Sequence, residues 1–326
     1  MLVAVMLVAV SIGAVNVPLG DVWRIVLHHV TGLGQKPDDF ALDQIVWQFR
    51  TPRVVLAALA GAGLALSGAV LQTVVANPLA DPVVLGFSYG ATLGAVLVIT
   101  LGGGTALLGL GVSAAAFAGS VVAGALVFWL GRRRGRMAPT RLILAGVAVG
   151  YVFLSATSYV QLQASPTQLR TVMFWMLGSV AGAQWHQLPA AALVVVGCTA
   201  LLTLFGRKLN VLLAGDETAT SLGTDVNRLR TVLLLLSALL TGAVIAVAGS
   251  IGFVGLMVPH LVRLTVGADH RRLLPLSALL GAVYLVLVDL LSRTLSRPNE
   301  LPLGILTALL GAPFFLWLLR RNKGLD

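Results

Sequence analysis

Residues 54–75 read VVLAALAGAGLALSGAVLQTVV, a run of 22 residues without a charged side chain. A helix of about 20 apolar residues is long enough to cross the hydrocarbon core of a bilayer. Similar windows recur at roughly 1–18, 54–75, 83–101, 105–130, 141–163, 188–206, 231–250, 251–267, 273–292 and 302–319. The sequence therefore predicts an all-α polytopic membrane protein, with ten transmembrane helices in one domain over residues 1–326.

Two of these windows are less regular than the others. The first is expected to be a span shortened at its start. The eighth, 251–267, contains Pro259 and several glycines, so it is either a span or a re-entrant or broken segment that lines a cavity.

The composition supports a membrane protein. Hydrophobic residues make up 58% of the chain, charged residues only 10%, and the mean hydropathy is +0.95. An excess of 22 basic over 12 acidic residues would suggest nucleic-acid binding in a soluble protein. Here we expect it to reflect orientation in the membrane, with no nucleic-acid partner. The single cysteine, Cys198, lies in an apolar run and is expected to be a buried, inert thiol.

The distribution of Lys and Arg indicates the orientation. When ten spans are threaded with the N-terminus inside, the inner loops contain 15 of the 22 basic residues. These lie mainly in 132–141, 207–230, 263–272 and 320–323. The positive-inside rule then predicts that both termini, and the polar segment 206–230, face the cytoplasm.

The segment 206–230, GRKLNVLLAGDETATSLGTDVNRLR, is the longest polar interruption in the middle of the chain. We expect a short helix that Asp216 N-caps and Gly223 closes, with Thr224 capping a second turn. The small side chains of Gly215 and Ala219 would let this helix pack tightly against a partner. An ordinary solvated loop between two spans is the alternative.

The chemistry of an ion-coupled carrier or an enzyme is missing from the predicted spans. Their centres carry no ionisable side chain, and Asp289 lies near the outer end of the ninth. His260 has no second ligand at metal spacing, and no GxxxxGK[ST] phosphate loop is present. We therefore expect no catalytic residue, metal site or cofactor in this chain, and we expect any nucleotide chemistry on a partner. An ion-coupled secondary transporter is a remote alternative.

Small residues predict close contacts between helices. Gly86, Gly90 and Gly94 form two successive GxxxG steps in the third window, and Gly146 with Gly150 forms another in the fifth. Such faces let helix backbones approach in lipid. The pattern indicates a dense bundle without specifying its function.

Several strings taken together resemble the FecCD-type permeases of type II ATP-binding-cassette (ABC) importers for iron chelates, haem and vitamin B12. Their order and spacing cover nearly the whole chain. They are RTPR at 50–53, SGAVLQ at 67–72, NPLADPVVLG at 77–86, FWMLGS at 174–179, GSIGFVGLMVPHLVR at 249–263, ELPLGILTA at 300–308 and GAPF at 311–314.

The resemblance implies a permease in a bacterial inner membrane, as a homodimer or paired with a paralogous permease. Two cytoplasmic ATPase subunits would bind ATP and Mg²⁺, and an extracytoplasmic binding protein would deliver the cargo. The implied cargo is a ferric siderophore or related iron chelate, with haem and cobalamin as alternatives. The segment 206–230 would then be the ATPase-coupling element, with Gly215, Asp216, Glu217, Ala219, Ser221 and Gly223 as its coupling residues.

The resemblance also implies two further sets of site residues. Arg50, Arg53 and Arg293 match positions that pair with acidic residues of the binding protein, where exposed charges would contribute mainly to orientation and on-rate. The alternative is that Arg50 and Arg53 anchor a helix end by snorkelling. A mildly polar stripe on the fifth span would line the translocation path, unless its hydroxyls bond to their own helix backbone. The stripe consists of Tyr151, Ser155, Ser158 and Gln161.

Overall fold

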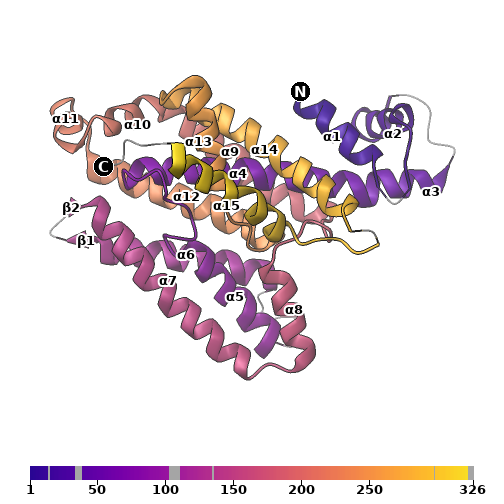
Figure 1. Cartoon of the computed structure of the whole chain (residues 1–326), viewed down its shortest axis with the longest axis horizontal. Helices are drawn as coiled ribbons and strands as arrows, with labels where there is room; N and C mark the ends of the chain where they lie inside the picture. Colours follow the sequence, from indigo (N-terminus) through magenta and orange to yellow (C-terminus); the bar gives the residue numbers. More distant parts are fainter. Residues whose placement is uncertain (14, 34–38, 103–110, 134–135, 297, 322–326) are drawn as a thin grey trace.

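The computed structural model describes the chain except for residues 14, 34–38, 103–110, 134–135, 297 and 322–326. The described part is a helical bundle with one short β-hairpin, whose two strands have two residues each (Figure 1). Its elements are α1 (Leu2–Ser11), α2 (Leu19–Thr31), α3 (Phe40–Asp43), the π-helix η1 (Gln44–Arg50), α4 (Thr51–Val74), α5 (Phe87–Leu101), α6 (Val112–Gly131), β1 (Arg132–Arg133), β2 (Arg136–Met137), α7 (Pro139–Leu162), α8 (Pro166–Met176), the 3₁₀ helix η2 (Trp185–Gln187), α9 (Leu188–Leu204), α10 (Gly206–Leu213), α11 (Asp216–Ser221), α12 (Val226–Ala248), α13 (Val254–Val266), α14 (His270–Thr294) and α15 (Leu303–Arg321).

Helix α4, which contains the apolar run 54–75, is the centre of the bundle. It packs against α1, α9, α12, α13 and α14, and nearly all of its side chains are buried. Alanine, glycine and leucine dominate its sequence, so neighbouring helices can approach it from every side. The buried hydrophobic core is therefore built around α4.

Each of the ten predicted windows contains a helix. Six helical segments of the described chain are long and apolar enough to cross a membrane, and four apolar helices, α1, α5, α13 and α15, are shorter. The start of the fourth window, 105–110, lies outside the described residues. The eighth window forms the 13-residue helix α13 after the non-helical stretch 249–253, so it is too short to cross a bilayer alone.

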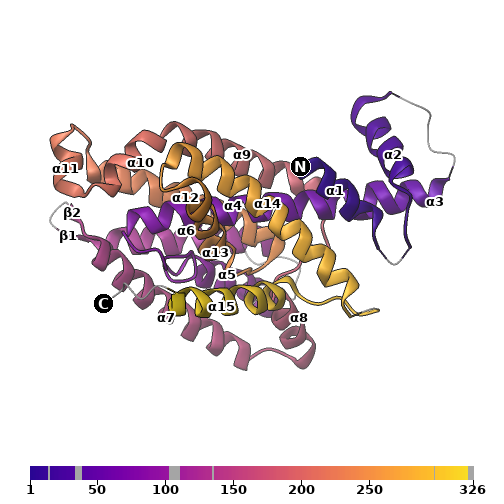
Figure 2. The same cartoon turned by 45° about the horizontal axis from the view of Figure 1, so that its top comes forward.

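Some helices lie outside these windows. Helices α2 and α3 and η1 project at one end of the long axis, whereas α10, α11 and the β1–β2 hairpin lie at the opposite end (Figures 1 and 2). Helix α8 follows α7 and packs against α5. A capping box begins α8, because the Ser165 hydroxyl accepts from Gln168 N and the Gln168 side chain accepts from Ser165 N.

Glycines mark the points of closest helix contact. A Cβ atom on Gly90 or Gly94 would lie 2.3 or 2.1 Å from a backbone carbonyl of α6, and one on Gly86 would lie 3.0 Å from Gly146 O. The close packing predicted from the GxxxG steps is therefore confirmed. Two further crossings involve α4, where a Cβ on Gly61 would meet the α14 backbone and one on Gly68 the α13 backbone.

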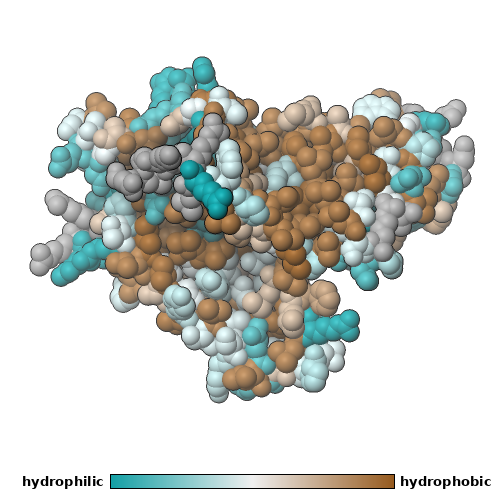
Figure 3. All heavy atoms as spheres, viewed as in Figure 1, coloured by the Kyte–Doolittle hydropathy of each residue, from teal (hydrophilic) through white to brown (hydrophobic). Residues whose placement is uncertain are grey.

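The surface agrees with a bilayer around the middle of the molecule. On the face shown in Figure 3, apolar side chains cover much of the centre, and hydrophilic ones gather toward the ends of the long axis and on the lower lobe, where α7 and α8 meet. Helices α6 and α9 are apolar yet only 28% of each spanning window is buried inside the chain. Such surface is stable only in lipid or against another membrane subunit.

Candidate functional site

Helix α11 lies in the middle of the segment 206–230. It begins at a different N-cap from the one predicted, and it ends as predicted. Gly215 is the N-cap, with φ 98° and ψ 160°, a backbone conformation that only glycine adopts readily. The Asp216 side chain does not cap the helix, which corrects the expectation. At the other end Gly223 has φ 79°, and its N–H and that of Thr224 donate to Thr220 O and Ala219 O. Gly223 thus closes α11 in a Schellman motif, as predicted.

The next helix is capped by a neighbour of the predicted residue. Asp225, not Thr224, is the N-cap of α12, and its carboxylate accepts a hydrogen bond from Arg228 N at 2.9 Å. Thr224 is instead part of the turn that ends α11, where its N–H donates to Ala219 O. The two helices are therefore joined by a tight connection rather than by a loose loop.

Asp216 is drawn away from the helix end by Arg230 of α12. The Arg230 guanidinium donates to both Asp216 carboxylate oxygens, at 2.6 and 2.8 Å. It also donates to Val74 O at the end of α4 (3.2 Å) and to Met137 O of β2 (2.9 Å). Only 3% of the Arg230 side chain is exposed, compared with 51% for Asp216. One buried cation therefore joins α11, α4, the hairpin and α12.

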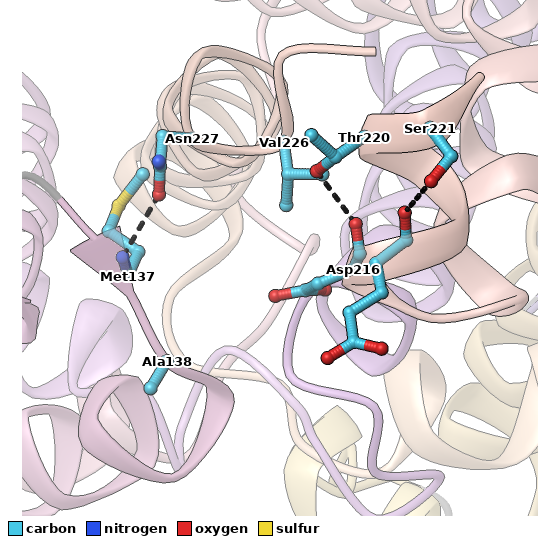
Figure 4. A pocket seen from close by; sticks show the side chains of 8 residues that line it. Met137, Ala138, Asp216, Thr220, Ser221, Val226 and Asn227 are labelled. Atoms are coloured by element: carbon cyan, nitrogen blue, oxygen red, sulfur yellow. Dashed lines mark hydrogen bonds between the residues drawn. The ribbon is translucent and has the colours of Figure 1, made fainter. Parts of the chain in front are cut away.

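An open groove of about 750 Å³ lies between α11, the hairpin and the start of α12. Figure 4 shows Asp216, Thr220 and Ser221 on the α11 side, with Met137 and Asn227 facing them from β2 and α12. Glu217 also lines the groove. The Asn227 amide oxygen accepts from Met137 N at 3.0 Å, which fixes the hairpin against α12.

The sequence-predicted coupling residues divide into two groups. Asp216, Glu217 and Ser221 line the groove, and Gly215 and Gly223 shape the turns at either end of α11. Ala219 has no exposed surface because it packs into the core of this chain. The expectation that its small side chain contacts a partner is therefore wrong.

Helix α10 is fastened to α14 and, through it, to α4. The Asn210 side chain donates to Asp269 Oδ1 (2.6 Å) and accepts from His270 N (2.8 Å), and His270 Nε2 is 2.7 Å from Thr73 Oγ1 of α4. The hydrogen bond from Asn210, followed by that from Arg271 N, lowers the pKa of Asp269 from its usual value. Both α10 and α11 are thus connected to the same end of α4.

The three predicted docking arginines lie near the opposite end of α4, on η1, α4 and α14, and none of them is exposed. Arg53 pairs with Asp289 of α14 (Nε–Oδ1, 2.9 Å) and with Glu300 (Nη2–Oε2, 2.8 Å). Arg293 lies 3.1 Å from Asp289 Oδ2 and donates to the carbonyls of residues 9 and 12 at the end of α1. Arg50 donates to the carbonyls of residues 10, 11 and 15.

Each of these arginine residues is only 8 to 9% exposed. The expectation of freely exposed charges is therefore wrong, because groups far away in the sequence bind them. Glu300 is the exception within this cluster, with 43% of its side chain exposed. The docking role itself stays a prediction.

The predicted stripe on α7 is only partly one surface. Ser155, Ser158 and Gln161 line an open cavity of about 830 Å³ between α7 and α8, whereas Tyr151 is 66% exposed and does not line it. The Ser158 hydroxyl donates to Leu154 O, and the Gln161 amide donates to a sulfur atom of α8. For Ser158 the backbone-bonded alternative is the one observed. A role in translocation stays a prediction.

Residues 1–321 match the model of the FecCD transport family. The chain belongs to this family. Among its FecCD relatives, the cobalamin import permease BtuC of Halobacterium salinarum is 47% identical over 86% of this chain and 74% of its own length. The hemin transport permease HmuU of Yersinia pestis is 44% identical over 85% of this chain and 84% of its own.

Other relatives cover more of this FecCD chain. The Fe(3+)-citrate import permease YfmE of Bacillus subtilis is 37% identical over 98% of this chain and 94% of its own length. A solved structure, described as an inward-facing ABC transporter of the metal-chelate type, superimposes with a TM-score of 0.85 at 34% identity, covering 98% of this chain and 96% of that one. The relatives are thus ABC importer permeases, and the chain shares their all-α fold.

Sequence reasoning missed three residues that organise these sites. Arg230 was counted only as an inner-loop charge, and neither Asn210 nor Glu300 was assigned a role. The one available signal was spacing, because Arg230 follows Asp216 by 14 residues across a predicted turn and could return to it. No local pattern indicated that Arg53 would meet a carboxylate 236 residues away.

Proposed function

We propose that the chain is the membrane-spanning permease subunit of an ABC importer that moves a bulky metal chelate into the cytoplasm of a bacterium. The family match over residues 1–321 carries this proposal. The subunit works as a homodimer or beside a paralogous permease in the inner membrane. ATP and Mg²⁺ bind to two partner ATPase subunits, and an extracytoplasmic binding protein delivers the cargo.

Ferric siderophores and related iron chelates are the proposed cargo. Cobalamin is the second candidate, favoured by the 47% identity to a permease named for cobalamin import. Haem is the third, because a hemin permease is 44% identical. These identities are too close to separate the three cargoes, so transport measurements must decide.

The proposed ATPase-docking surface consists of the exposed side of α11 and the groove beside it. Glu217 and Ser221 offer polar contacts there, and Leu213 and Leu222 flank α11 with 50% and 66% of their surface exposed. Apolar residues exposed at an end rich in polar side chains are typical of a protein interface. Movement of an ATPase at α11 would reach α4 through Arg230 and the α10 contacts.

This assignment fixes the orientation of the chain. The α11 end faces the cytoplasm, and α15 ends toward that side, whereas the ten-residue helix α1 begins away from it, nearer the middle of the long axis (Figures 1 and 2), which corrects the expectation for the N-terminus. The Arg50, Arg53 and Arg293 cluster then faces the outside, where it is the proposed docking site for acidic residues of the binding protein. Because Glu300 already occupies Arg53 and is partly exposed, an incoming carboxylate would compete with it. The α7–α8 cavity with Ser155, and Tyr151 nearby on α7, would face the cargo path in the assembled dimer.

Reconstitution tests the proposal. The permease is placed in liposomes with its ATPase and its binding protein, and uptake of labelled ferric siderophores, haem and cobalamin is measured. We expect uptake of one cargo that requires ATP, is blocked by vanadate and is indifferent to a protonophore. Uptake that resists vanadate and is abolished by a protonophore would identify a secondary transporter and overturn the proposal.

A further inference from the structure

A second concave surface lies away from both proposed docking sites. It is a groove of about 340 Å³ between α6, η2, α9 and α12. Its walls are small or apolar, including Phe117 of α6, Ala190 and Val194 of α9, and Ala246 of α12. Three polar residues, His186 and Gln187 of η2 and Ser113 in the first turn of α6, lie at the end of the groove where α6 and α9 begin. We call this surface the α6–α9–α12 groove.

The groove opens on a part of the molecule that contacts the membrane. It is walled by α6, α9 and α12, all of which are long and apolar enough to cross the bilayer. Outside the groove, α9 exposes large side chains such as Leu193 (76%) and Val196 (63%). The groove therefore opens to the hydrocarbon core of the bilayer.

The polar end of the groove coincides with the membrane–water boundary. His186 and Gln187 form η2, immediately before the span α9. Their neighbour Trp185 packs against Trp47 with ring centroids 4.4 Å apart and the rings tilted by 32°, and it donates to Trp47 O at 2.8 Å. Tryptophans are enriched at the membrane–water boundary of membrane proteins because the ring is apolar and its N–H is polar. The groove thus runs from the interface into the hydrocarbon.

We propose that the α6–α9–α12 groove binds one glycerophospholipid of the extracytoplasmic leaflet. One acyl chain lies along Phe117, Ala190 and Ala246, where small side chains leave room for a flexible hydrocarbon. Gln187 and His186 donate hydrogen bonds to the phosphate or ester oxygens of the head group. A partner's membrane helix satisfies its own backbone groups, so it would leave the donors at this end of the groove without acceptors.

Native mass spectrometry of the purified permease tests this site, with palmitoyl-oleoyl phosphatidylglycerol as the probe. We expect the wild type to retain one phospholipid per chain after the remaining lipid has been removed. Ala190→Phe fills the groove and should lower the occupancy about tenfold, since it displaces roughly two methylene groups of the chain. The matched control is Leu193→Phe on the exposed side of the same helix, which should keep the lipid.

A second variant separates head-group recognition from a loss of folding. The double variant His186→Leu and Gln187→Leu leaves the apolar walls intact, so it should weaken retention of the phospholipid but not of hexadecane, which has the hydrocarbon chain and no hydrogen-bond acceptor. Equal phospholipid retention by the wild type and Ala190→Phe would overturn the proposal. Cross-linking from a photoreactive probe on Ala190→Cys to a polypeptide rather than to lipid would also overturn it.

Discussion

Replacing Arg230 with alanine should release α11 from the rest of the bundle. The buried guanidinium is the hydrogen-bond donor to Val74 O and Met137 O, and each carbonyl left without it costs about 1 to 2 kcal/mol. The ion pair with Asp216 adds only about 0.5 to 1 kcal/mol, because that carboxylate is half exposed and rehydrates. Opening of α11 lets water reach both carbonyls in the variant, so a loss of about 3 kcal/mol raises the equilibrium constant for this local opening roughly 100-fold.

Hydrogen–deuterium exchange of the peptide covering 213–226, in the reconstituted transporter, measures this opening. Amide exchange there should accelerate roughly 100-fold in Arg230→Ala, and ATP hydrolysis should continue without matching uptake. Asp216→Asn, which keeps an acceptor oxygen, should give a much smaller change. Arg228→Ala, on the exposed side of the same helix, serves as the control and should exchange like the wild type. Wild-type exchange in Arg230→Ala would refute the idea that this arginine holds α11 in place.

Three other predictions concern charge, docking and packing. Burial raises the pKa of Asp81 to about 6, so the stability contributed by its neutral form is complete below pH 4 and is lost as the pH rises through 6. At pH 8 the free energy of unfolding of Asp81→Asn should therefore exceed that of the wild type by about 2 to 3 kcal/mol, seen as a higher unfolding temperature. The difference should disappear near pH 4. Glu300→Gln should raise the affinity of the binding protein for immobilised transporter about twofold to fivefold, because the carboxylate that competes for Arg53 is removed. Arg53→Gln should lower this affinity, and the opposite order of affinities would exclude competition. Gly61→Val should destabilise the bundle by about 3 kcal/mol or more in thermal unfolding, because its Cβ would lie 2.0 Å from an α14 carbonyl, while Gly197→Val, which meets nothing within 4 Å, should be near neutral.

The bundle could be predicted from the sequence because its signal is local. An uncharged run such as 54–75 must form a helix in lipid, since only a helix satisfies its backbone groups within the segment. Gly223 was recognised for a similar reason, because the end of α11 requires a left-handed residue at that position. Where a few neighbouring residues determine the backbone, sequence patterns are sufficient.

The side-chain contacts could not be predicted because they join distant segments. Asp216 has the composition of an N-cap, but a buried arginine on another helix competes for its carboxylate. Ala219 resembled a docking residue in sequence, and only the packing of α11 showed that it is buried. Arg53 looked like a surface charge because its partners, Asp289 and Glu300, lie at the far end of the chain.

Helix α4, like its neighbours α9 and α12, has no proline in its interior, which bears on how movement could cross the membrane. Its proline lies in the first turn, whereas α13, α14 and α15 each contain a proline in their interior. An internal proline removes a backbone hydrogen bond and permits a kink, so those three helices can bend more readily than α4. The α4 backbone approaches α14 at Gly61 and α13 at Gly68. Arg53 and Thr73 also bond α14, and Gln72 bonds α13, so these helices are fastened to α4 at several points. A displacement imposed near α11 would therefore be carried along α4 to the arginine cluster through these contacts, while the three helices with an internal proline flex beside it.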